Sequence, residues 1–90
     1  MPRYYDICEH VQNGDTFRTT KQKWIRLAHY DAPDEVEPNY AKAKQLLSSL
    51  ILDKKIVYEQ VGASHNQIVA EVWQGVKSIN VIMIQSGYQK

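Results

Sequence analysis

Short segments of alternating apolar and polar residues make up most of this chain, and one helical repeat interrupts them. This order limits the possible folds more than any other feature of the sequence. Strand-like segments lie at 4–11, 16–20, 24–30, 55–61 and 68–73. Between the third and the fourth, four apolar residues recur at the spacing of one buried helical face: Ala43, Leu46, Leu47 and Leu50.

The connections between these segments contain typical turn residues. Asn13-Gly14 predicts a hairpin turn, because both residues tolerate a positive φ angle. We expect further turns at 21–23 and 62–66. Residues 31–38 hold two prolines and four acids, which predicts a loop.

Cap residues mark two helices. Asn39 is suited to cap the first helix, and Ser78 is suited to cap a second helix over 79–86, which Gly87 ends. The resulting order is three strands, a helix, two strands and a helix. That order (β-β-β-α-β-β-α) is typical of a five-stranded OB-fold barrel. We therefore expect residues 1–90 to form one mainly β domain with helices, closed into a barrel.

Alternation also predicts which side chains share a face of a strand. In the first segment, one side carries Tyr5, Ile7 and Val11, and the other carries Cys8. In the third segment, Ile25, Leu27 and His29 alternate with Trp24, Arg26 and Ala28. Because Ile25 and Leu27 suit the core, Arg26 is expected to point outward.

Composition excludes several classes of protein. The formal net charge is only +1, so bulk charge does not predict nucleic-acid binding. Cys8 is the only cysteine, which excludes an intrachain disulfide and suits a reducing compartment. With the three histidines it matches no common zinc pattern. No signal peptide or apolar run of membrane length occurs, so we expect a cytoplasmic monomer.

The charges are unevenly distributed along the chain. Four cations, Arg18, Lys21, Lys23 and Arg26, precede four acids at 31–37. A basic strand pair beside an acidic loop could place a phosphate site next to a cation site. The alternative interpretation is two solvated faces of opposite charge.

Three motifs in order give the chain a resemblance to a known family. They are Gly14-Asp15-Thr16-Phe17, Arg26-Leu27 and Asp31-Ala32-Pro33-Asp34. With Ile79-Asn80 and Gly87-Tyr88 near the end, this pattern resembles the calcium-dependent nucleases of the staphylococcal nuclease family. The resemblance implies an OB-type barrel and phosphodiester hydrolysis in DNA or RNA.

The resemblance also implies roles for individual residues. Asp15, Asp31 and the backbone carbonyl of Ala32 match calcium ligands, and calcium prefers such oxygen donors. Arg26 matches the arginine that holds the scissile phosphate, for which a guanidinium fork is well suited. Asp34 stands where the family has a glutamate that activates water, and it is one methylene shorter.

Two departures from the family pattern predict weakened chemistry. Gln67 stands where the family has a second catalytic arginine, and Asn13 stands where it has an aspartate near the metal. We therefore expect a weak or inactive calcium-dependent phosphodiesterase. The alternative is a non-catalytic OB-fold module that binds single-stranded nucleic acid or a protein partner. In either case, the candidate nucleic-acid contacts are Arg18, Lys23 and Trp24.

Overall fold

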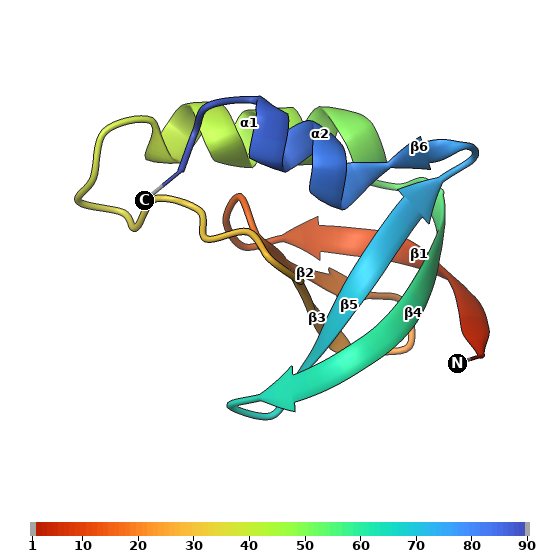
Figure 1. The fold of residues 1–90 in the computed structure, drawn as a ribbon. Helices are drawn as coiled ribbons and strands as arrows, with labels where there is room; N and C mark the ends of the chain where they lie inside the picture. Colours follow the sequence, from red (N-terminus) through yellow and green to blue (C-terminus); the bar gives the residue numbers. More distant parts are fainter. Residues whose placement is uncertain (1, 90) are drawn as a thin grey trace.

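The computed structural model describes residues 2–89, in which two helices lie over one end of a β-barrel (Figure 1). The strands are β1 (Arg3–Val11), β2 (Thr16–Thr19), β3 (Trp24–Leu27), β4 (Lys55–Ser64), β5 (Gln67–Gln74) and β6 (Lys77–Ser78). The helices are α1 (Tyr40–Ile51) and α2 (Ile79–Gln85). Within residues 2–89, no helix has the length and apolar character needed to cross a membrane.

The barrel closes through one parallel contact. Antiparallel pairing joins the strands in the order β3-β2-β1-β4-β5, and β3 then pairs with β5 in parallel. This closed five-stranded arrangement confirms the predicted OB-type fold. The short strand β6 extends β5 as a hairpin and was not predicted, because two residues show no periodicity.

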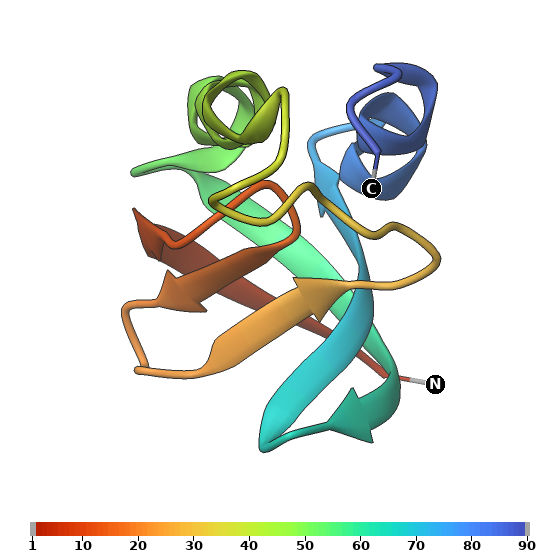
Figure 2. The same ribbon diagram turned by 90° about the vertical axis from the view of Figure 1, so that its left-hand side faces the viewer.

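The helices cover the barrel with their apolar faces. Figure 2 shows α1 and α2 side by side above the strands. Ala43 and Leu47 of α1 are fully buried, and Leu46 and Leu50 pack against the core, which confirms the predicted helical face. Met83 of α2 is also fully buried.

Helix capping agrees with the sequence in α2 and only in part in α1. Ser78 accepts a hydrogen bond from the Val81 amide at 3.3 Å, and Gly87 has a φ of 83°. Asn39 occupies the predicted N-cap position with a φ of 70°, and its side chain makes no capping hydrogen bond. The predicted N-cap position is therefore confirmed, but Asn39 contributes only its backbone carbonyl, which accepts from the Ala43 amide at 2.9 Å.

An irregularity in β1 changes the predicted faces. The β1–β2 register shifts between Cys8 and His10, as at a β-bulge, and Val11 is buried together with Cys8. Tyr5 and Ile7 lie on the exposed face instead. The prediction that these two share a face with Val11 was wrong, because an extra residue reverses the alternation.

The structure also corrects two strand ends. β3 stops at Leu27, after which His29 is exposed with a φ of 62° and Ala28 is buried. The predicted turn at 62–66 contracts to His65-Asn66, with φ angles of 50° and 64°. Two positive φ values match a two-residue hairpin turn, so β4 and β5 extend further than the turn residues suggested.

Candidate functional site

The loop before β2 packs tightly beneath α1, and Gly14 makes this packing possible. A Cβ atom on Gly14 would lie 2.7 Å from the Cβ of Ala43 and 2.9 Å from the Cβ of Ala32. Neither Asn13 nor Gly14 has a positive φ, so the predicted reason for this glycine was wrong. Close packing requires glycine here, and it brings the loop 12–15 against the acidic loop that follows β3.

Asp15 is the fixed centre of the site. It is only 7% exposed, and its Oδ1 accepts a hydrogen bond from the Thr16 hydroxyl at 2.8 Å. Its Oδ2 accepts from the Ala32 amide at 3.0 Å, and its own amide donates to Asn13 Oδ1 at 3.0 Å. The Asp15 carbonyl also accepts from the Leu27 amide at 2.8 Å. Asp15 therefore joins the loop 12–15 and the acidic loop at 31–38 to β3.

Arg26 links the two carboxylates predicted to bind metal. Its Nε lies 3.6 Å from Asp15 Oδ2, and its Nη2 donates a hydrogen bond to Asp31 Oδ1. The side chain of Asp31 is 70% exposed, whereas that of Asp15 is only 10% exposed. The structure thus brings Asp15, Arg26, Asp31 and the Ala32 backbone together. We call these four residues the Arg26 cluster.

Tyr30 anchors the acidic loop next to this cluster. Its hydroxyl donates a hydrogen bond to the Tyr88 carbonyl at 2.5 Å. Burial raises the pKa of the Tyr30 hydroxyl, and the nearby charge of Asp15 raises it further. Tyr30 is therefore a neutral hydrogen-bond donor at neutral pH, and it ties the loop to the end of the chain.

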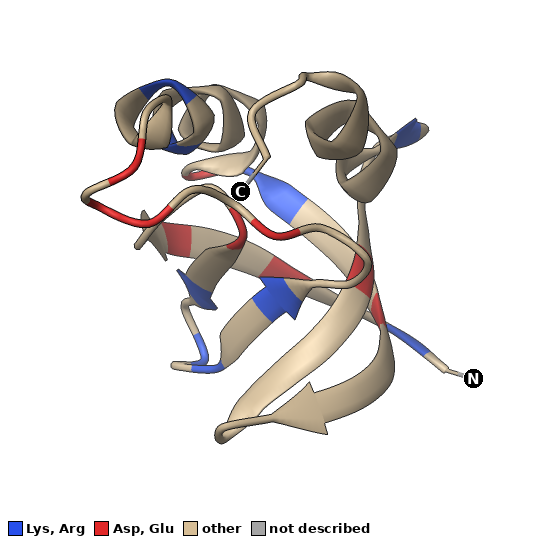
Figure 3. Cartoon of the chain, turned by 60° about the vertical axis from the view of Figure 1, so that its left-hand side comes forward, with Lys and Arg blue, Asp and Glu red and all other residues tan. Residues whose placement is uncertain are grey.

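Asp34 lies on the outer part of the acidic loop. Its amide donates to Glu37 Oε1 at 3.0 Å, and its carbonyl accepts from the Glu37 amide at 2.8 Å. Figure 3 shows acidic positions spread along this loop. Asp34 borders an open hollow of about 360 Å³, which is lined by Gln12, Asn13, Asp34, Glu35, Val36 and Tyr40. The Arg26 cluster does not line this hollow.

The metal donors are few. Among residues 2–89, no three His, Cys, Asp or Glu side chains come together as a metal site. The donors available to a cation at the Arg26 cluster are therefore two carboxylates and backbone oxygens. These hard oxygens suit calcium better than zinc, but Arg26 already contacts both carboxylates.

Comparison with known families decides the assignment. The family model for staphylococcal nuclease homologues matches residues 24–90, which is most of the chain. The chain belongs to this family. A search of curated proteins found no match to the chain. The matched range includes Arg26, Asp31, Ala32, Asp34 and Gln67, whereas Asp15 lies before it.

In this staphylococcal nuclease homologue, Gln67 lies near Arg26 but further along the neighbouring strand. Arg26 is paired with Val69 in the parallel β3–β5 register. Gln67 is two residues earlier in β5, so it shares that face at about 7 Å along the strand. It is the first residue after the His65-Asn66 turn and pairs with Ser64. Its amide brings no positive charge to this face.

The three candidate nucleic-acid contacts lie on β2, β3 and the turn between them. Arg18 Nε lies 2.8 Å from Glu9 Oε2, and the guanidinium lies 5.6 Å from the centre of the Trp24 ring. Lys23 is exposed in the turn that precedes Trp24. Arg18 and Trp24 are thus together, but an acid partly neutralises the arginine.

Sequence reasoning missed the structural role of Asn80. Its side-chain amide donates to the carbonyls of Ala28 and Ala70, each at 3.0 Å, and its Oδ1 accepts from the Val72 amide at 2.8 Å. Asn80 therefore fastens α2 to β5 and to the residue that follows β3. The Ile79-Asn80 pair was noticed only as part of the family resemblance, and its bonds required the tertiary structure.

Proposed function

We propose that this domain binds the phosphodiester backbone of single-stranded nucleic acid at the Arg26 cluster and hydrolyses it slowly in a calcium-dependent reaction. The observation that carries the proposal is the position of Arg26, outward on β3 and between two carboxylates. A guanidinium in this place can form two parallel hydrogen bonds to a phosphate. Membership of the nuclease family supports the same ligand.

The donor chemistry of Asp15, Asp31 and the Ala32 carbonyl fits calcium. A bound calcium ion would supply positive charge that stabilises the developing negative charge on the phosphate. Arg26 must leave at least one carboxylate before both its hydrogen-bonding edges can face a phosphate. The buried, hydrogen-bonded Asp15 would stay in place during this change, and the exposed Asp31 would move.

Two residues explain why the proposed hydrolysis is slow. Gln67 offers hydrogen bonds without charge, and loss of one transition-state donor costs about 10²–10³ in rate. Asp34, proposed as the base that activates water, borders a hollow that the Arg26 cluster does not share. A general base must come within hydrogen-bond reach of its proton, so the acidic loop has to shift for catalysis.

A non-catalytic binding module is the second candidate function. The ion pairs of Arg18 with Glu9 and of Arg26 with Asp15 and Asp31 favour it, because both arginines already have acidic partners. Such a module would hold single-stranded nucleic acid or a protein partner. Binding that weakens steeply with salt would identify a phosphate partner.

The test combines binding and cleavage in one set of variants. Labelled single-stranded DNA and RNA are titrated with the wild type and with Arg26→Gln, in calcium and in a calcium chelator. Arg3→Gln is the matched control, because Arg3 is exposed and contacts Glu59 at 3.4 Å and the Trp73 ring at 4.4 Å, not the Arg26 cluster. The proposal predicts that Arg26→Gln alone reduces affinity at least tenfold and removes calcium-dependent cleavage.

Gln67→Arg tests the explanation of slow hydrolysis. Restoring the charge should raise the cleavage rate by about a hundredfold. Binding without any cleavage, in both the wild type and Gln67→Arg, would support the non-catalytic module. Equal binding by the wild type and Arg26→Gln would refute the role of Arg26.

A further inference from the structure

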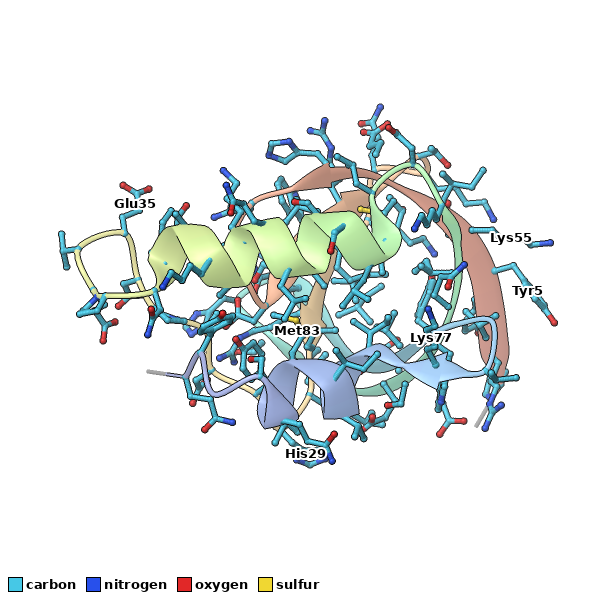
Figure 4. The ribbon with its side chains drawn as sticks, turned by 90° about the horizontal axis from the view of Figure 1, so that it is seen from above. Tyr5, His29, Glu35, Lys55, Lys77 and Met83 are labelled. Atoms are coloured by element: carbon cyan, nitrogen blue, oxygen red, sulfur yellow. The ribbon has the colours of Figure 1, made fainter. Side chains whose placement is uncertain are left out.

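The first half of β1 has a neighbouring strand on one side only. Residues 3–7 pair with β4, but the pairing of β1 with β2 begins only at Cys8. On the unpaired side lies a hollow of about 340 Å³, which is lined by Tyr5, Asp6, Ile7, Thr20, Lys21 and Lys55. Figure 4 shows Tyr5 and Lys55 next to each other, at the opposite end of the molecule from Glu35.

The hydrogen bonds of β1 show which backbone groups face the unpaired side. The Cys8 amide donates at 3.3 Å to the carbonyl that precedes β4, whereas the Ile7 carbonyl accepts from the Thr20 amide at 2.9 Å, on the side of β2. Residues of an antiparallel strand direct their N–H and C=O groups alternately to one neighbour and the other. Arg3 and Tyr5 therefore point these groups away from β4, as Ile7 does. We call residues 3–5 the open edge.

Ile7 and Asp6 close the inner end of the open edge. The Ile7 amide donates to Asp6 Oδ1 at 2.8 Å, and the Thr20 hydroxyl donates to the same atom at 2.9 Å. Burial raises the pKa of Asp6. The Ile7 amide, the hydroxyls of Thr19 and Thr20, and the Lys21 ammonium act against burial and bring this pKa below the usual 3.8. Asp6 is therefore a buried acid that holds the strand in place, and the edge available to a partner ends before it.

The outer face beside the open edge carries exposed apolar groups and two cations. Tyr5 is 61% exposed and Ile7 is 43% exposed, and the Lys55 ammonium lies 4.9 Å from the centre of the Tyr5 ring. Lys21 is exposed at the rim of the same hollow. Among residues 2–89, neither lysine forms a salt bridge. Lysines at a strand edge repel a second copy of the same edge, but they attract a strand with negative charge.

Apolar surface lies on the other face of the open edge. The Tyr4 side chain is 48% exposed, and its ring packs against that of Tyr58 with the centres 5.5 Å apart. Tyr4 also borders a hollow of about 300 Å³, which is lined by Pro2, Tyr4, Gln60, Val61 and Gly62. Directly opposite residues of two antiparallel strands contact each other, so a residue added opposite Tyr4 would cover this ring.

We propose that the open edge docks an extended segment of a partner protein in which acidic and apolar residues alternate. The segment adds to β1 as an antiparallel strand, and its backbone pairs with the N–H and C=O groups of Arg3 and Tyr5. Paired residues have their side chains on the same face, so the acids lie beside Tyr5 and Lys55 and the apolar residues cover Tyr4. The inference does not depend on nucleic-acid binding at the Arg26 cluster.

The first experiment is a titration of ¹⁵N-labelled protein with a short, end-blocked peptide of alternating glutamate and valine, followed by NMR. The peptide should shift the amides of Arg3 and Tyr5 and slow their hydrogen exchange. N-methylation of the glutamates removes the donors that face the edge and should weaken binding about tenfold or more. N-methylation of the valines is the matched control, because their N–H groups face solvent.

Three results of this titration would overturn the proposal. They are an absence of shifts at the open edge, equal binding of the glutamate–valine peptide and a lysine–valine peptide, and equal weakening by the two N-methylated peptides. Protection of the same amides by oligo(dT) instead of the peptide would identify nucleic acid as the occupant. Protection that rises with protein concentration in the absence of peptide would identify a second copy. Either would also overturn the choice of an acidic partner segment.

Two sets of variants test the charges and the backbone separately. Replacing Lys21 and Lys55 together by glutamine should weaken binding of the glutamate–valine peptide about fivefold, as two exposed ion pairs predict. Replacing the exposed Lys42 and Lys77 together removes the same charge elsewhere and is the control. Unequal effects in this direction support the charge argument, and equal effects would overturn it.

Tyr5→Pro removes the N–H that faces the open edge without removing a bond to β4, a position where strands accept proline. It should abolish the peptide-induced shifts, whereas Tyr5→Val keeps the N–H and should keep the shifts. Hydrogen exchange of the free wild type gives a test that needs no variant. The Tyr5 amide should exchange faster than the Tyr4 amide, which faces β4, and equal protection of the two would show that the edge is not open.

Discussion

Replacement of Asn80 by alanine should destabilise the domain more than most single substitutions. The side chain is 2% exposed and makes three hydrogen bonds, to Ala28, Ala70 and Val72. Truncation leaves the buried Ala28 carbonyl and Val72 amide without the partner that the side chain supplied. An orphaned buried group costs about 1–3 kcal/mol, so two of them cost about 2–6 kcal/mol, and we expect a loss of about 3 kcal/mol.

This loss is large compared with the total stability of a small domain, which is about 5–15 kcal/mol. Urea unfolding followed by tryptophan fluorescence would measure it, and thermal unfolding should show a Tm lower by roughly 12–24 °C. Gln85→Ala is the control, because Gln85 is an exposed residue of the same helix. That substitution should change stability by less than about 0.5 kcal/mol.

A loss below about 1 kcal/mol for Asn80→Ala would refute the reasoning. It would mean that water or a small backbone movement satisfies the Ala28 carbonyl and the Val72 amide, and that α2 is not fastened through this side chain. A loss equal to that of Gln85→Ala would have the same meaning.

Further predictions concern packing, thiol reactivity and pH. Gly14→Ala should lower the free energy of unfolding in urea by about 1–3 kcal/mol, because the added Cβ would lie 2.7 Å from the Cβ of Ala43. Gly62→Ala is the control and should be close to neutral, because the nearest atom to its added Cβ is 3.9 Å away. Burial raises the pKa of Cys8 to about 11, so a thiol reagent at pH 8 should react about a hundredfold faster after unfolding in urea; equal rates would contradict a buried thiol. Because the folded pKa of Asp6 is lowered, its ionisation stabilises the fold above the unfolded value of 3.8, and this contribution is lost as pH falls through the lower folded pKa. Stability measured against pH should therefore fall less steeply in acid for Asp6→Asn than for the wild type.

Local patterns predicted the elements because each pattern depends on near neighbours in the chain. The spacing of Ala43, Leu46, Leu47 and Leu50 identified α1, and Ser78 and Gly87 marked the ends of α2. The bulge after Cys8 and the exit from β3 at Ala28 were missed. Both depend on how one strand pairs with its neighbour. The alternation of residues along a single strand gives no information about that pairing.

For the candidate site, the sequence supplied the chemical groups and their order. Asp15, Arg26, Asp31 and Ala32 were chosen by motif, and the structure places them together. The motif did not show that Arg26 contacts both carboxylates, nor that Asp34 borders a separate hollow. Those relations arise from the packing of two loops against each other, which Gly14 permits.

The sequence by itself therefore determined the order of strands and helices, the family, and the residues available for chemistry. The tertiary structure alone decided the parallel β3–β5 closure, the pairing of Arg26 and the burial of Asp6. The physical reason is range. Periodicity and capping act over a few residues, whereas barrel closure, ion pairing and burial join residues that are far apart in the chain.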